Sequence, residues 1–145
     1  MAKSKHDKII LDLKNRVQKN LEDIVLNNYE YDLDYFTHGE IDCAYVNKDR
    51  NYAYVFEVKT NDSLSAHRKA RYQLLRDIYF IQLDYDINNI WCFYSNPNKE
   101  VTNPENIHLE FNYFNGNLYD FHNNKIIELL DKFHKLFIRR LADTV

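Results

Sequence analysis

Residues 39–60 read GEIDCAYVNKDRNYAYVFEVKT, two runs rich in Ile, Val, Tyr, Phe and Ala on either side of a polar segment. β-Branched and aromatic residues flanking a short polar loop are typical of a β-hairpin. If residues 48–51 form the loop, Asn47 pairs with Tyr52 and every other pair follows from that register.

The two faces of this hairpin differ in character because side chains alternate along a strand. One face is predicted to be apolar throughout, with Ile41, Cys43, Tyr45, Tyr52, Tyr54, Phe56 and Val58. The other face carries small aliphatic residues and ends in charge, with Ala44, Val46, Ala53 and Val55 followed by Glu40, Asp42, Glu57 and Lys59.

The charged end of the hairpin predicts either a cation site or a simple ion pair. The register places Asp42 opposite Glu57 and Glu40 opposite Lys59. Directly opposed acidic residues have Cβ atoms about 5 Å apart, and their carboxylates repel each other unless a cation sits between them. Mg²⁺ takes oxygen ligands and fits that position. The alternative is a cross-strand ion pair of Glu40 with Lys59 beside two solvated carboxylates.

Gly-Glu-Ile-Asp at 39–42, followed by Phe-Glu-Val-Lys-Thr at 56–60, resembles the PD-(D/E)XK nuclease superfamily, which has the restriction-endonuclease-like fold. The pattern is most similar to archaeal Holliday junction resolvases and to RecB-type nucleases. The resemblance in residues covers 39–60, and the resemblance in the order of elements covers about 8–95.

The resemblance implies a metal-dependent DNA endonuclease with Asp42, Glu57 and Lys59 as catalytic residues. Asp42 and Glu57 would bind Mg²⁺ or Mn²⁺ together with the Val58 carbonyl. Lys59 would orient or deprotonate the attacking water and help to neutralise the phosphate.

Three further residues are candidates for completing this site. Many superfamily members place another acidic ligand on the first helix, where Glu22 lies, and Glu40 is a second candidate ligand. RecB-type relatives use a Gln on the helix after Glu-x-Lys, where Gln73 lies. Surface roles for Glu22 and Gln73 remain open, and His38 is either a ligand beside the site or a polar loop residue.

Periodicity and turn signals assign the rest of the chain. Before the hairpin of 39–60, we expect a helix over 7–27 with Asp7 as N-cap, a strand over 29–36, and a turn over 37–39 with Gly39 at positive φ. After that hairpin, we expect a helix over 64–81 opened by Asn61-Asp62-Ser63 and a strand over 88–95. The chain then continues with a predicted hairpin of 107–114 and 117–121 around Asn115-Gly116 and a predicted helix over 123–141. This order predicts an α/β fold in a single domain of residues 1–145. The resemblance implies that its αβββαβ part is a restriction-endonuclease-like core, with a mixed sheet flanked by helices and an added C-terminal β-hairpin and helix.

The charge distribution leaves room for a nucleic-acid surface. The chain has a formal net charge of −3, so DNA would have to bind through local basic faces. The predicted DNA contacts are Arg68, Arg71, Arg76 and Gln73 on the helix after Glu-x-Lys, with Lys14 and Arg16 on the first helix. The alternative is that these charged residues form helix faces that contact only solvent.

Composition also bears on the environment of the chain. No apolar run approaches about 20 residues and no apolar leader begins the sequence, so we expect no membrane span and no signal peptide. Cys43 and Cys92 fall in strand patterns and are predicted to be buried thiols. We expect a cytoplasmic, intracellular protein that forms a homodimer through the apolar stripe of its last helix.

Two other functional classes remain open. The chain could be a catalytically silent member of the nuclease fold that binds DNA or protein through the same surface. It could also be a protein-interaction module of unrelated fold, in which case divalent ions would not change its thermal stability.

Overall fold

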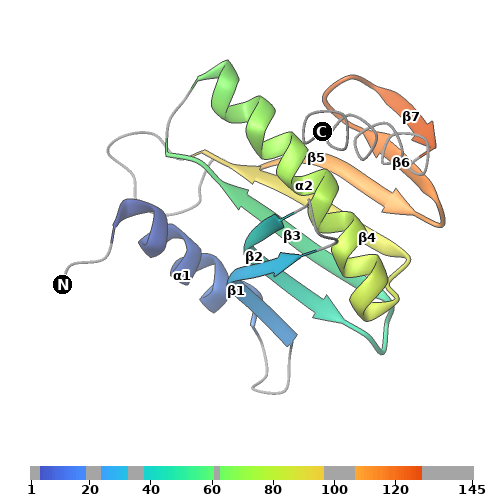
Figure 1. The fold of residues 1–145 in the computed structure, drawn as a ribbon, viewed down its shortest axis with the longest axis horizontal. Helices are drawn as coiled ribbons and strands as arrows, with labels where there is room; N and C mark the ends of the chain where they lie inside the picture. The colour runs from blue at the N-terminus through green and yellow to red at the C-terminus, as the bar shows by residue number, and fades with distance from the viewer. Residues whose placement is uncertain (1–3, 19–23, 33–37, 61–62, 97–106, 129–145) are drawn as a thin grey trace, which may run out of the picture.

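The computed structural model describes residues 4–18, 24–32, 38–60, 63–96 and 107–128 (Figure 1). Its elements in chain order are α1 (Lys5–Val17), β1 (Ile24–Asp32), β2 (His38–Asn47), β3 (Tyr52–Val58), α2 (Leu64–Tyr85), β4 (Asn89–Ser95), β5 (Ile107–Phe114), β6 (Asn117–Asp120) and β7 (Lys125–Glu128). The α/β class and the order α-β-β-β-α-β at the start of the chain are confirmed.

The seven described strands form one sheet in chain order. Neighbouring strands are antiparallel except β3 and β4, which are parallel, so the sheet is mixed. Parallel neighbours need a long crossover connection, and α2 provides it, lying across the front of the sheet in Figure 1. The carboxyl ends of β3 and β4 therefore lie side by side at the same end of the sheet.

The β2–β3 hairpin has the predicted register. Asn47 pairs with Tyr52, and the regular ladder continues to the pair of Cys43 with Phe56. Asp42 and Glu57 come directly after the last regular pair, at the end of the hairpin away from its loop.

The two helices cover opposite faces of the sheet. α1 packs through Ile9, Ile10 and Leu13 on a cluster that contains Cys43, Phe56 and Val58. α2 packs through Leu74, Leu75, Ile78, Phe80 and Ile81 on a larger cluster that contains Ala44, Val46, Ala53 and Val55. Both faces of the hairpin are thus buried.

The prediction that Ile41 lies on the same face of the hairpin as Cys43 is wrong. Ile41 is fully buried in the cluster beneath α2, whereas Cys43 faces α1. Asn28 of β1 lies between the pairs made by these two residues and has a φ of 48°. The register with β2 is the same on both sides of Asn28, so no residue is inserted. The left-handed backbone of Asn28 departs from extended strand geometry, and strict alternation fails next to Asp42.

The predicted first helix is too long. α1 ends at Val17, and Ile24, Val25 and Leu26 belong to β1, which spans 24–32 rather than 29–36. These residues fit a helical stripe as well as a strand, and their pairing with β2 decides in favour of the strand. The N-cap is Ser4, whose side chain accepts a hydrogen bond from the Asp7 backbone N–H, and not Asp7 itself. Residues 33–36 lie outside the described residues.

Gly39 does not form a turn at positive φ as predicted; it lies inside β2 opposite Tyr31. A Cβ atom built on Gly39 would meet the Tyr31 ring carbon Cζ at 2.3 Å. Glycine is therefore needed here because an aromatic ring lies over the backbone.

The second half of the chain follows the predictions closely until β7. Ser63 caps α2, which runs four residues beyond the predicted end at 81, and β4 matches the predicted strand to within one residue. Asn115 and Gly116, with φ of 47° and 93°, form the turn of the predicted second hairpin. Two left-handed residues are what a type I′ turn requires.

The predicted C-terminal helix over 123–141 is wrong at its start, because residues 125–128 pair with β6 as strand β7. As strand β7, these residues pair with the backbone groups along the open edge of β6. A helix at 125–128 would leave those groups of β6 unpaired. Residues 129–141 lie outside the described residues, so the homodimer expected from their apolar stripe stays a prediction.

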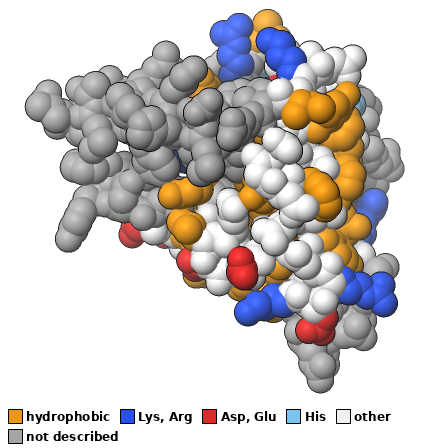
Figure 2. Space-filling model, turned by 90° about the vertical axis from the view of Figure 1, so that its right-hand side faces the viewer, with side chains coloured by type: hydrophobic (Ala, Val, Ile, Leu, Met, Phe, Trp, Pro, Cys, Tyr) orange, Lys and Arg blue, Asp and Glu red, His pale blue; other side chains and the backbone are white. Residues whose placement is uncertain are grey.

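Aromatic residues of the second hairpin divide between core and surface. Phe111 and Tyr113 are buried beneath α2, while Phe114 and Phe121 are exposed. On the side of the molecule in Figure 2, hydrophobic side chains form a band with Lys and Arg at its upper and lower ends. Among the described residues, no helix has the length and apolarity required to span a bilayer.

Candidate functional site

Two of the predicted site carboxylates lie buried at the end of the β2–β3 hairpin. Asp42 and Glu57 are 5% and 2% exposed. The Val58 backbone N–H donates a hydrogen bond of 2.8 Å to Asp42 Oδ2, which fixes Asp42 across the end of β3. Burial raises the pKa of Glu57 well above its ordinary value, and the nearby Asp42 carboxyl raises that pKa further.

Lys59 lies beside this pair. Its Nζ is 3.6 Å from Glu57 Oε1, and its side chain is about a quarter exposed. The Lys59 backbone N–H donates to the Ser95 carbonyl at 3.0 Å, so the strand end that carries Glu57 is joined to β4. Asp42, Glu57 and Lys59 are therefore brought together, as the motif predicts.

A third buried carboxylate, which the sequence interpretation missed, comes from α2. Asp77 is fully buried, and the Tyr31 hydroxyl donates a hydrogen bond of 2.5 Å to its Oδ1. Burial raises the pKa of Asp77, and repulsion from Asp42 adds to that rise, although the Tyr31 hydrogen bond opposes it. The sequence did contain a signal for the burial of Asp77, because this residue falls in the apolar stripe of its helix, next to Ile78.

His6 is the second missed residue. Its Nε2 is 3.0 Å from the Val58 carbonyl oxygen and 3.4 Å from Asp42 Oδ2. The interaction with Asp42 raises the pKa of His6 above its ordinary value, although partial burial opposes the rise. His6 precedes the apolar stripe of α1 by one turn, and only that stripe could have drawn attention to it.

The residues present fit a divalent cation. Among the described residues, Glu57 Oε2 and Asp77 Oδ2 are buried carboxylate oxygens with no hydrogen-bond partner. A buried, unpaired carboxylate oxygen is costly unless a cation or proton satisfies it. The donor set of Asp42, Glu57 and the Val58 carbonyl consists of oxygens, which Mg²⁺ and Mn²⁺ prefer.

The remaining candidate ligands are less closely placed. Glu40 pairs with Glu30 of β1 and not with Lys59, although its charge contributes to the raised pKa of Asp77. Gln73 lies one turn before Asp77 on α2, and its Oε1 is buried without a hydrogen-bond partner among the described residues. Glu22 lies outside the described residues.

The predicted DNA-binding residues differ in their exposure and in the partners they bind. On α2, Arg68 is exposed, Arg71 is bound to Glu110 and Asp120, and Arg76 donates to the His38 carbonyl. On α1, Lys14 is half-buried and Arg16 pairs with Asp12. His38, for which the sequence leaves open a ligand role and a polar loop position, is the first residue of β2, and its Nδ1 lies 2.9 Å from Asp32 Oδ1.

No family model, curated protein or solved structure matches this chain. The function is therefore inferred from the residues of the site and from their geometry.

Proposed function

We propose that the protein is a metal-dependent DNA endonuclease with a restriction-endonuclease-like fold. The observation that carries the proposal is the burial of Asp42 and Glu57 at one end of the hairpin, where Asp42 raises the pKa of Glu57 and the Lys59 ammonium lies 3.6 Å from Glu57. Two buried carboxylates and a lysine, gathered at one end of the hairpin, support the assignment of the Asp…Glu-x-Lys signature to these residues. The order α1-β1-β2-β3-α2-β4, with β3 parallel to β4, supports the proposed fold.

Asp42, Glu57 and the Val58 carbonyl would hold Mg²⁺ or Mn²⁺. When bound, such a cation polarises a phosphoryl oxygen and lowers the pKa of bound water. In its ammonium form, Lys59 would place a positive charge beside the phosphate and orient the attacking water. In its neutral form, Lys59 would instead accept the proton of that water. When ionised, Asp77 and Glu40 add negative charge around the site, and a bound cation would favour that ionised form.

His6 acts at the same two oxygens, the Val58 carbonyl and Asp42 Oδ2. In the protein without metal, a protonated His6 places positive charge beside the buried carboxylates, which its raised pKa favours. Metal binding at these oxygens would require His6 to move or to join the ligand set.

His6 also favours a second candidate function, a catalytically silent DNA-binding module of the same fold. If His6 holds the site permanently, no metal can reach the Val58 carbonyl. The protein would then bind DNA through exposed cations such as Arg68 without cleaving it.

Cleavage assays on four-way junctions, single strands and duplex ends distinguish these functions. Mg²⁺ or Mn²⁺ should support cleavage, and Ca²⁺ should bind without supporting it. We expect Asp42→Asn and Glu57→Gln to abolish cleavage and Lys59→Ala to slow it by about 10²–10⁴-fold.

Asp49→Asn is the matched control, because Asp49 is an exposed carboxylate in the loop at the other end of the same hairpin. Its activity should equal that of the wild type. Normal cleavage by Asp42→Asn, or full activity in excess chelator, would refute the nuclease proposal. DNA binding with no cleavage under any metal would favour the silent module.

A further inference from the structure

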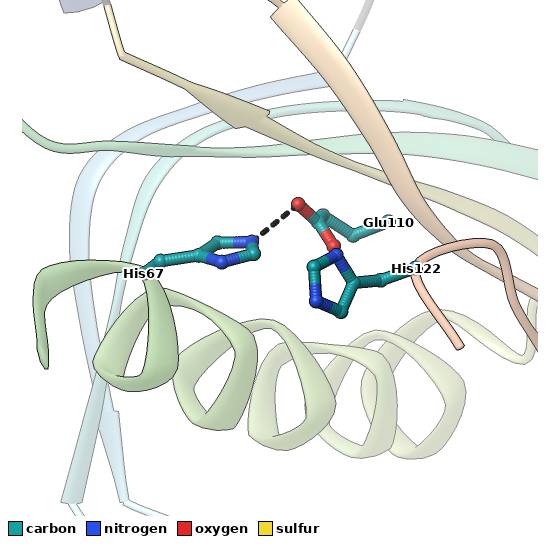
Figure 3. Close-up of side chains that lie close together, drawn as sticks. All are labelled: His67, Glu110 and His122. Carbon is teal, nitrogen blue, oxygen red and sulfur yellow. Dashed lines mark hydrogen bonds and ion pairs between the residues drawn. The ribbon is translucent and has the colours of Figure 1, made fainter. Parts of the chain in front are cut away.

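A second group of potential metal ligands lies where α2 faces β5, and none of its members belongs to the β2–β3 hairpin. His67 comes from the first turn of α2, Glu110 from β5, and His122 from the turn between β6 and β7 (Figure 3). One ligand atom from each residue lies within 4.8 Å of the others. The closest pair is His67 Nε2 and Glu110 Oε1, at 2.6 Å.

A β-bulge directs Glu110 toward this group. Cys92 pairs with Phe111 and Phe93 pairs with Leu109, so Glu110 is an extra residue in β5. Strict alternation would place Glu110 and Phe111 on opposite faces. Instead both face α2, because Phe111 packs in the cluster beneath α2 while Glu110 contacts His67. Bulges that redirect a side chain in this way are frequent next to functional sites.

Arg71 fixes the orientation of the carboxylate. Its Nη1 donates to Glu110 Oε2 at 2.6 Å, which leaves Oε1 directed at His67. The other guanidinium nitrogen, Nη2, donates to Asp120. Asp120 Oδ1 also accepts from the backbone N–H of His122 at 3.0 Å, so the same network holds the turn that presents the second imidazole. Outer contacts of this kind are what orient the ligands in known metal sites.

The charge balance of this network favours a cation. Glu110 and Asp120 supply two negative charges against the single positive charge of Arg71, because both carboxylates bind the same guanidinium. With neutral imidazoles, the network therefore carries one net negative charge in a partly buried setting. A divalent cation would reverse that to one positive charge.

All three residues line a cavity of about 500 Å³, to which Tyr94 and His108 also contribute. His122 is exposed, so the cavity is accessible to an ion from solvent. The space beside the three ligand atoms can hold a water molecule or a small ligand.

We propose that His67, Glu110 and His122 bind a divalent transition-metal ion, with Zn²⁺ as the best match, and leave a fourth position open to the cavity. Two imidazoles and one carboxylate are a zinc ligand set, and an open fourth position is typical of catalytic rather than structural zinc. Ligand bonds of about 2.0–2.1 Å in a tetrahedron put the ligand atoms roughly 3.3 Å apart. The 2.6 Å contact between His67 and Glu110 thus opens by only about 0.7 Å as the metal replaces the shared proton.

The proposal is independent of the nuclease proposal, since the nitrogen ligands here favour Zn²⁺ and the oxygen ligands of the hairpin site favour Mg²⁺. Calorimetric titration of the full chain, without an affinity tag that contains histidine, measures Zn²⁺ binding. The visible absorption of bound Co²⁺ reports tetrahedral nitrogen and oxygen coordination. We expect one Zn²⁺ per chain and a rise in melting temperature with Zn²⁺ concentration.

His122→Ala removes an exposed ligand and should weaken Zn²⁺ binding on the order of 100-fold or more, because loss of an outer contact alone costs about 10–100-fold. His108→Ala is the matched control, since His108 lines the same cavity but is not one of the three ligands. Asp42→Asn tests independence from the hairpin site. Both variants should bind Zn²⁺ like the wild type.

Three results would overturn the proposal. The first is the absence of saturable Zn²⁺ binding, and the second is unchanged affinity in His122→Ala. The third is loss of binding in Asp42→Asn, which would place the metal at the hairpin carboxylates instead.

Discussion

Replacing Glu57 with Gln should stabilise the metal-free protein at neutral pH. The Glu57 side chain is 2% exposed, its Oε2 has no hydrogen-bond partner among the described residues, and its pKa is raised by burial and by Asp42. Gln has nearly the same shape and carries no charge, so the substitution removes the repulsion without opening a cavity.

The size of this effect follows from proton linkage. Because the pKa of Glu57 is higher in the folded state than in the unfolded state, its favourable contribution to stability is complete below the unfolded pKa of about 4.3. That contribution is lost as the pH rises toward the folded pKa. Within this window the wild type loses about 1.4 kcal/mol of unfolding free energy per pH unit through this group. The Glu57→Gln variant has no such loss of unfolding free energy, because glutamine does not titrate.

Urea unfolding in chelator between about pH 4.5 and 7.5 measures the difference. Glu57→Gln and wild type should be similar at the acidic end and diverge by about 1.4 kcal/mol per pH unit above it. That corresponds to roughly 3–6 °C in melting temperature for a domain of this size. Asp49→Asn, which changes an exposed carboxylate, should follow the wild type throughout. A constant difference across the pH range would refute the raised pKa of Glu57.

Four further substitutions test other parts of the structure. Gly39→Ala should destabilise the protein by about 1–3 kcal/mol, since the new methyl group would overlap the Tyr31 ring, and thermal unfolding measures this loss. Arg71→Ala should cost about 3–5 kcal/mol because it removes the arginine cation that two buried carboxylates share. Arg68→Ala, on the exposed face of the same helix, should change stability by no more than about 0.5 kcal/mol. In salt titrations of DNA binding, however, Arg68→Ala should lower the slope of log K against log salt by about 1. His6→Ala should be destabilising at acidic pH and less so as the pH rises through the raised pKa of the folded state, where the wild-type imidazole loses its charge; unfolding at both ends of that range measures the change.

The sequence by itself was sufficient for the elements whose signals are local. The β2–β3 register follows from a polar loop of four residues between two β-prone runs. The start of α2 follows from the cap at Ser63, and the β5–β6 turn from Asn115-Gly116. In each case the residues that determine the structure lie within a few positions of one another, so propensity and turn geometry act before any tertiary contact forms.

Tertiary structure alone decided where the local signals were ambiguous or silent. The run at 24–26 fits a helix or a strand, and only pairing with β2 makes it β1. His6 contacts Val58 across 52 positions, Tyr31 reaches Asp77 across 46, and His67 meets Glu110 across 43. No local periodicity encodes such separations. They arise because the two helices pack on opposite faces of one sheet, and a bulge at Glu110 then turns a side chain that alternation would have directed to the other face.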